Sequence, residues 1–161
     1  MASLFKLLRR AISGGPFYVR ISRGRLRVRD ISGGGNFDDE PIVVLSGDIP
    51  PKITAIGRNA RNASAKWINP FSHPRIIIHE FMIAEKLLMH SFKEVSGKQF
   101  VRAAPVVIMH VTDNLEGGLT DIERRALQEL ALSAGARECH VWEGRELTDG
   151  ELRAGAYKSA L

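Results

Sequence analysis

The chain has a single cysteine, Cys139, among its 161 residues, and it has no long apolar run. One thiol excludes an internal disulfide, and without a secretory pattern it favours a reducing compartment. No stretch approaches the ~20 apolar residues that a membrane-spanning helix needs. Because no evident base accompanies Cys139, we expect this side chain to pack against its neighbours and not to act as a nucleophile.

The chain also lacks the short motifs of several common chemistries. It has no Gly-x-x-x-x-Gly-Lys-Ser/Thr phosphate loop and no Gly-x-Ser-x-Gly nucleophile elbow. Its five histidines include no pair at the i, i+4 spacing of a zinc-binding helix, and one cysteine supplies no second thiolate. We therefore predict no metal site and no catalytic residue, and we interpret the histidines as surface or core residues.

Acidic residues are missing from the first 29 positions, which carry a formal charge of +8. The rest of the chain has 15 basic and 18 acidic residues, so its charge is −3. The net charge of +5 therefore belongs to one end of the chain. Such asymmetry predicts an anionic partner for that end, either a membrane surface or a nucleic acid.

Residues 2–12 are amphipathic on a helical projection, with apolar side chains on one face and basic side chains on the other. This pattern is typical of a helix that lies in the membrane interface. Packing of the helix on the domain and a targeting peptide are the alternatives, although Arg9 and Arg10 disfavour a secretory signal because they interrupt the apolar region. Within residues 1–13, the predicted membrane-binding side chains are Leu4, Phe5, Lys6, Leu7, Leu8, Arg9 and Arg10.

The hydrophobic pattern after a Ser-Gly-Gly hinge predicts alternating strands and helices. Strands are expected at residues 17–21, 26–31, 41–45, 105–111 and 138–142. Helices are expected at residues 80–95 and from Thr120 to the glycine at 135, with Glu123 at the capping-box spacing. Ile122 is expected in the buried stripe of this second helix. A glycine-rich loop is expected at residues 32–36, and a polar tail at residues 145–161 with at most one short, poorly held helix.

The first two predicted strands form a hairpin in which arginine alternates with aliphatic residues. Because the period is two, Arg25, Arg27 and Arg29 line one face of the second strand. Three interpretations remain open: a solvated face, a second contact with anionic lipid, or a grip on nucleic-acid phosphates. The absence of interleaved aromatic rings disfavours nucleic acid.

Four segments resemble, in the same order, segments of the bacterial actin-like, rod-shape-determining family (MreB). DEPIVVL at 39–45 resembles its N-E-P-S-V strand, and KITAIGRNARNA at 52–63 its K-x-x-A-x-G-x-x-A-K segment. Residues 79–95 resemble its D-[FY]-x-x-x-E-x-[ML]-L helix, and residues 120–144 its TD-x-ERRA helix, GA turn and strand. The resemblance covers about residues 16–144 and implies an α/β fold. The implied domain is a partial actin-like (ribonuclease H-like) one, with a mixed β-sheet, flanking helices and a small insert at about residues 46–68.

The chain departs from the family at the first phosphate loop, I-D-L-G-T-[AS]-N. In the family the aspartate of this loop lies near the metal, and the Gly-Thr amides approach the phosphates. Here the resemblance places Arg20 at the aspartate position, and Ser22, Arg23 and Gly24 form a vestigial phosphate loop. The chain also stops before the second phosphate loop of the family, so we expect half of the nucleotide cleft to be missing.

A second departure concerns the glutamate that polarises the attacking water. The family has Glu-Glu-Pro after the strand, and the second glutamate has this role; here the matching residues are Glu143, Gly144 and Arg145. A shift of register that lets Glu143 substitute would turn its side chain to the other face of the strand. The resemblance therefore implies a protein that is not an ATPase, and we expect no cofactor, although binding of ATP with magnesium is not excluded.

These expectations combine into a non-hydrolysing, MreB-like protein of the cell-shape cytoskeleton. It is expected in the cytoplasm, peripheral on the inner face of the cell membrane, with an anionic membrane surface as partner. A full-length actin-like filament protein or a second copy is the other expected partner. Two further hypotheses remain: an ATP-binding protein that completes its site with a partner chain, and a basic nucleic-acid-binding module. A degenerate fragment without a selected activity also fits the sequence.

Overall fold

The computed structural model describes residues 15–97, 103–113 and 115–159. The segment predicted to bind a membrane, residues 1–13 with Leu4 to Arg10, lies outside the described residues. Within the described ranges, no helix is long and apolar enough to cross a membrane.

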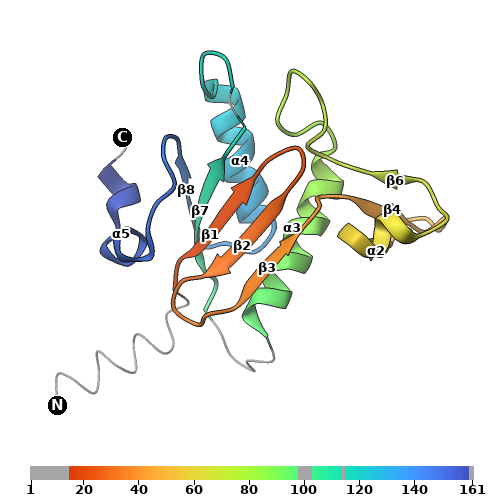
Figure 1. Cartoon of the computed structure of the whole chain (residues 1–161), viewed down its shortest axis with the longest axis horizontal. Coiled ribbons are helices and arrows are strands. Elements are labelled where there is room, and N and C mark those ends of the chain that lie inside the picture. Colours follow the sequence, from red (N-terminus) through yellow and green to blue (C-terminus); the bar gives the residue numbers. More distant parts are fainter. Residues whose placement is uncertain (1–14, 98–102, 114, 160–161) are drawn as a thin grey trace.

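A five-stranded mixed sheet forms the centre of the molecule, in the order β3-β2-β1-β7-β8 (Figure 1). Strands β1 to β3 are antiparallel neighbours, whereas β7 runs parallel to both β1 and β8. The carboxyl ends of β1, β7 and β8 therefore meet at one end of the sheet, where open α/β sheets commonly bind ligands. The bounds are β1 (Phe17–Ile21), β2 (Leu26–Asp30), β3 (Asn36–Asp39), β7 (Val106–Val111) and β8 (Glu138–Trp142).

Helices cover both faces of this sheet, because alternate side chains of its strands are apolar on both sides. Helices α3 (Phe81–Ser96) and α4 (Asp121–Ser133) pack on the face that carries Phe17 and Val19. The opposite face carries Tyr18 and Ile108 and packs against the C-terminal part of the chain. The main core thus lies between the sheet and the helix pair α3 and α4.

Helix α4 begins at the predicted capping box. The hydroxyl of Thr120 accepts a hydrogen bond from the Glu123 N–H, and the Glu123 carboxylate accepts the Thr120 N–H at 3.0 Å. The expectation for Ile122 is wrong, since its side chain is 81% exposed. At 100° per residue, Ile122 points well away from the arc of the helix that faces the sheet. The buried residues of that arc are Leu127, Leu130 and Ala131.

The third strand of the main sheet differs from the predicted one. Strand β3 follows directly after the glycine-rich loop, whereas the predicted strand 41–45 contains β4 (Val43–Leu45), which belongs to a second sheet. The residues of β3, Asn-Phe-Asp-Asp, lack an apolar alternation because β3 is a half-exposed edge strand. Its pairing with β2 and the contacts of Asp38 with two arginines hold it in place.

A small second unit contains strands β4, β5 (Ile53–Ile56) and β6 (Trp67–Ile68) in the order β5-β4-β6, with helix α2 (Gly57–Asn62). This unit begins at Val43, slightly before residue 46, at which the predicted insert begins. Asp39 at the end of β3 ties this unit to the main sheet, because its carboxylate accepts the Arg58 N–H at 3.0 Å. Gly57 is required there: its φ is +58°, and a Cβ would lie 2.1 Å from the Asp39 carboxyl carbon.

The predicted polar tail is part of the fold as far as residue 159. Helix α5 (Asp149–Ala154) begins with a second capping box, Thr148 with Glu151, and the 3-10 helix η1 (Ala156–Ser159) follows it. The prediction of a poorly held helix is wrong, because sparse apolar residues in a polar sequence can still fill one face. Those that pack against the face with Tyr18 and Ile108 are Leu147, Leu152 and Tyr157.

Candidate functional site

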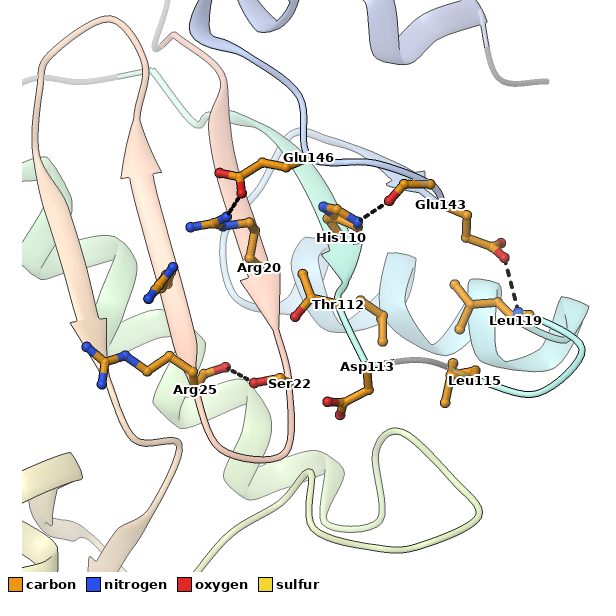
Figure 2. A pocket seen from close by; sticks show the side chains of 14 residues that line it. Arg20, Ser22, Arg25, His110, Thr112, Asp113, Leu115, Leu119, Glu143 and Glu146 are labelled. Carbon is orange, nitrogen blue, oxygen red and sulfur yellow. Dashed lines mark hydrogen bonds and ion pairs between the residues drawn. The ribbon is translucent and has the colours of Figure 1, made fainter.

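A cleft of about 710 Å³ lies at the carboxyl ends of β1, β7 and β8 (Figure 2). The β1–β2 turn forms one wall, and the segments after β7 and β8 form the others. Most of its polar side chains are charged, and both signs are present. The lining residues are Arg20, Ser22, Arg25, Arg27, His110, Val111, Thr112, Asp113, Leu115, Gly118, Leu119, Glu143, Gly144 and Glu146.

The vestigial phosphate loop is a tight hairpin turn in which the amides of Ser22 and Arg23 are bound within the chain. The Ser22 N–H donates to the Arg25 carbonyl oxygen at 2.9 Å. The Arg23 N–H donates to Asp113 Oδ2 at 2.8 Å, so a carboxylate of this chain occupies the position that an anion would need. Gly24 has open space around its Cβ position and no positive φ, so no close approach requires a glycine there.

Arginines of the cleft pair with carboxylates of the same chain. Figure 2 shows Arg20 on β1 directed at Glu146, with which it forms an ion pair. Arg25 and Arg27 on the hairpin share Asp38, with Nε to Oδ1 distances of 2.6 and 3.1 Å. These contacts, chiefly the hydrogen bond from Arg25, hold the pKa of the Asp38 carboxyl below its usual range. Asp38 therefore offsets part of the positive charge of Arg25 and Arg27, and the Arg23 side chain donates to the Pro74 carbonyl oxygen at 3.0 Å and not to a carboxylate.

A buried polar network supports the floor of the cleft. His110 Nε2 lies 3.0 Å from the Gly144 carbonyl oxygen, which can only accept, so Nε2 carries a proton. Burial lowers the pKa of His110, so the ring is neutral and its Nδ1 accepts from the Tyr18 hydroxyl at 2.6 Å. The same hydroxyl accepts the Leu147 N–H at 3.2 Å. The network thus fixes the segment after β8 against β1 and β7.

Gly144 and Glu143 complete the cleft at the end of β8. Gly144 has a φ of +123° and contributes only backbone. Figure 2 shows the Glu143 carboxylate directed at Leu119, whose N–H it accepts at 3.1 Å. The same carboxylate forms an ion pair with Arg124 of α4. The Glu143 side chain is therefore engaged in holding the segment before α4.

Sequence reasoning located part of this site and missed part. The structure brings Arg20, Ser22 and Gly144 to one cleft, whereas Arg23 and Gly24, the other residues of the vestigial phosphate loop, do not line it. It adds Asp113 and Glu146, which were not singled out, and it places His110, one of the histidines interpreted as surface or core residues, in the floor of the cleft. Asp113 could have been found, because it lies two residues after the end of a buried strand, where ligand sites form. His110 carried no such signal, since a histidine inside an apolar strand shows its role only through Tyr18.

The described residues outside the cleft contain no metal-binding cluster and no activated cysteine. The described residues contain no group of three or more His, Cys, Asp or Glu side chains that could hold a metal ion. Cys139 is half-buried against the main core, and burial raises the pKa of its thiol to about 12. A thiol with this pKa is protonated at neutral pH and is a poor nucleophile.

Comparison with known proteins now identifies the family. Residues 28–148 match the family model described as MreB/Mbl protein. The chain belongs to the MreB/Mbl family. It is 35% identical over 124 residues to the cell shape-determining protein MreB of Pasteurella multocida, and 32% identical over 123 residues to that of Escherichia coli. These matches cover 70% of this chain but 33% and 34% of the relatives, so this family member spans about a third of their length.

Solved structures show the fold of this MreB/Mbl family member. It superposes on MreB5 of Spiroplasma citri bound to AMPPNP with a TM-score of 0.58 at 17% identity, over 80% of this chain and 38% of that one. The structure of the same protein bound to ADP gives a TM-score of 0.58 at 18% identity, with the same coverage. The predicted fold class, a partial actin-like α/β domain with a mixed sheet and flanking helices, is therefore confirmed.

Proposed function

We propose that this MreB/Mbl family member is a non-hydrolysing protein of the cell-shape cytoskeleton, held at the inner face of the cell membrane. It acts through protein contacts, with an actin-like filament protein or a second copy as partner. The names of the curated relatives, cell shape-determining proteins, support the cytoskeletal part. The membrane part rests on the amphipathic pattern and the charge of the first 29 residues.

The observation that carries the non-hydrolysing part is that carboxylates of this chain already bind the Arg20 side chain and the Arg23 N–H. Arg20, at the position where the family resemblance places an aspartate near the metal, pairs with Glu146. The Arg23 N–H, in the former phosphate loop, donates to Asp113. A phosphate in this place would have to displace a carboxylate that is already hydrogen-bonded, and it would be repelled by that carboxylate until it did.

The three carboxylates that line the cleft, Asp113, Glu143 and Glu146, are each bound to a group of the same chain, which opposes binding of a magnesium nucleotide. Magnesium prefers carboxylate and water oxygens in a nearly octahedral set, and a guanidinium at Arg20 opposes a cation there. Gly144 offers no side chain at the position of the water-polarising glutamate. The Glu143 carboxylate cannot replace it without breaking its bonds to Leu119 and Arg124. These contacts support a cleft that is structural and not catalytic.

Calorimetric titration of the purified chain with ATP and magnesium tests this proposal. We expect no binding heat up to millimolar nucleotide and no phosphate release above the protein-free rate. MreB5 of Spiroplasma citri, whose structure holds AMPPNP, is the positive control. Saturable binding in the micromolar range would contradict the proposal, and phosphate release only after addition of a partner chain would favour a shared ATPase site.

Flotation with anionic liposomes tests the membrane part separately. We expect the wild-type chain to float with vesicles and the Leu4→Glu and Leu8→Glu variants to stay in solution, because each puts a charge on the apolar face. Ile122→Glu is the matched control, since Ile122 is exposed on α4 and its replacement should leave flotation unchanged. Failure of the wild type to float, or unchanged flotation of both leucine variants, would contradict membrane binding.

The local pairing of the hairpin arginines weakens the nucleic-acid alternative. Arg25 and Arg27 share Asp38, and Arg29 pairs with Asp149 at 3.0 Å. A phosphate backbone would gain little from arginines that already have carboxylate partners. Steeply salt-dependent binding of single-stranded DNA, lost when these arginines are neutralised, would restore that alternative.

A further inference from the structure

A second groove, of about 580 Å³, lies between the small unit and helix α3, away from the cleft. This volume is within the range of about 300–1,000 Å³ that is typical of ligand sites. The groove is lined by Phe37, Asp39, Lys52, Ile53, Thr54, Ala55, Ile56, Asn59, Lys86, Met89 and His90. The lining includes the whole of β5, one residue before it, and one side of α3. In Figure 1 the small unit stands beside α3.

The groove runs along the outer edge of β5 and not along one of its faces. Successive side chains of a strand point to opposite faces, so only an edge can expose five consecutive residues, here 52–56, to one groove. In the order β5-β4-β6, strand β5 is terminal, and it pairs only with β4 among the described strands. Such an edge presents free backbone N–H and C=O groups that another strand can use.

The groove carries positive charges without partners. Neither Lys52 nor Lys86 has an ion pair with any residue in the described ranges, and His90 makes only a ring contact with Phe37. The carboxylate of Asp39 also lines the groove, but it already accepts the N–H groups of Glu40 and Arg58.

Apolar side chains lie between these charges. Phe37 and the two isoleucines of β5 are partly buried against the main core, and Met89 of α3 is 49% exposed. Together with the two lysines they make a mixed apolar and positive surface beside an unpaired strand edge.

We propose that this groove binds an extended acidic segment of a partner protein, which adds to the small sheet as a fourth strand beside β5. Backbone hydrogen bonds to the free edge supply the register, and alternate side chains supply specificity. Apolar side chains of the segment contact Met89 and Phe37, and its carboxylates reach Lys52 and Lys86. A second copy of the chain is a poorer occupant, because its β5 edge, Ile-Thr-Ala-Ile, offers no carboxylate to Lys52 and Lys86. The proposal does not depend on the state of the cleft.

Fluorescence anisotropy with a labelled peptide tests the proposal on the full chain. The probe is a heptapeptide of alternating glutamate and valine, and its controls are a lysine–valine peptide and a glutamate–valine peptide N-methylated on alternate residues. We expect saturable binding of the first peptide only, because the lysine peptide loses charge complementarity and the methylated peptide loses the edge hydrogen bonds. Equal binding of the methylated peptide would overturn strand addition. Equal binding of the lysine peptide, or no binding of any peptide, would overturn the proposal as a whole.

Charge-reversal variants locate the binding site. The double variant Lys52→Glu, Lys86→Glu should weaken binding of the glutamate peptide by about tenfold or more, and it should gain binding of the lysine peptide. Lys66→Glu, beside β6 at the opposite edge of the same small sheet, is the control for net charge and should bind like the wild type. An equal loss in the Lys66 variant, or none in the double variant, would overturn the assignment to this groove. Lys52 and Lys66 are exposed and Lys86 is half-buried, and circular dichroism verifies the folding of both variants.

Discussion

The two concave surfaces of this molecule differ in how their positive charges are balanced. In the cleft, Arg20 pairs with Glu146, and Arg25 and Arg27 share Asp38. In the groove beside β5, Lys52 and Lys86 have no carboxylate partner among the described residues. The cleft has more basic residues than the groove, but its arginines already contact carboxylates of the same chain. Local pairing, and not the number of basic residues, therefore decides which surface can attract an acidic partner.

The two surfaces also differ in the contacts that hold their walls. A buried network from Tyr18 through His110 to Gly144 fixes the segment at the rim of the cleft. The groove is bounded by a terminal strand of a three-stranded sheet, which has a free edge. A fixed and satisfied cleft suits a structural role, whereas a free edge suits the binding of a partner.

The largest effect is expected for Tyr18→Phe, which removes the hydroxyl that joins the cleft network. His110 Nδ1 and the Leu147 N–H would both be buried without a partner, at a cost of about 2–4 kcal/mol in the free energy of unfolding. Urea denaturation measures this loss. Tyr157→Phe is the control, because the Tyr157 hydroxyl donates to no group in the described ranges, and its change should stay below about 0.5 kcal/mol. Equal stability of the two variants would show that the cleft is not held by this network.

Gly57→Ala should disturb the groove and leave the cleft intact. The positive φ of Gly57 and the contact with the Asp39 carboxyl group together predict a loss of about 2 kcal/mol. Gly24→Ala, in the vestigial phosphate loop, is the matched control and should be close to neutral, since its Cβ meets open space. Thermal unfolding compares the two. A large loss for Gly24→Ala would mean that the loop still needs its glycine for a close approach.

The ion pair in the cleft should contribute a smaller, measurable coupling. A double-mutant cycle of Arg20→Ala and Glu146→Ala should give a coupling energy of about 1 kcal/mol, because Arg20 is largely buried while Glu146 is half-exposed and screened by water. Salt should weaken the coupling. A coupling near zero would show that Glu146 does not neutralise Arg20 in solution, and the cleft would then resemble the groove in having a free positive charge.

Asp38→Asn should change stability least. It should leave positive charges in the cleft without a carboxylate partner, as in the groove. It frees Arg25 and Arg27, so retention on a heparin column at pH 7 should rise, whereas Asp48→Asn on an exposed loop controls for the change in net charge. The pKa of Asp38 is lowered in the folded state, so its stabilising contribution is present above its usual value of about 3.8 and is lost as pH falls through the lower folded value. The variant should therefore lose part of the acid sensitivity of stability below about pH 4. Identical retention of the two variants would contradict local neutralisation by Asp38.

Periodic and local patterns were predicted well. The alternation of arginine with Leu26 and Val28 predicted β2, and the capping box at Thr120 predicted the start of α4. The same capping signal at Thr148 and Glu151 would have predicted α5, but the polar composition of the tail concealed it. Strand β3 was missed because an exposed edge strand needs no apolar pattern of its own.

The sequence predicted single residues of the site but not the pairs that they form. The resemblance identified Arg20 and Gly144 as departures from the family pattern. It did not identify Glu146, Asp113 or Asp38, which are ordinary acidic residues until the fold brings each beside an arginine side chain or its amide. The distances along the chain, 126 residues between Arg20 and Glu146 and 90 between Arg23 and Asp113, explain why no local pattern recorded them.

The sequence by itself determined the family, the positions of most helices and strands, and the concentration of positive charge in the first 29 residues. These properties follow from residue type and short-range periodicity, which act along the chain. Only the tertiary structure decided which charges are neutralised, which strand edge is free, and that residues 145–159 complete the core. Such properties depend on contacts between residues far apart in sequence, and electrostatic pairing and burial exist only once those contacts have formed.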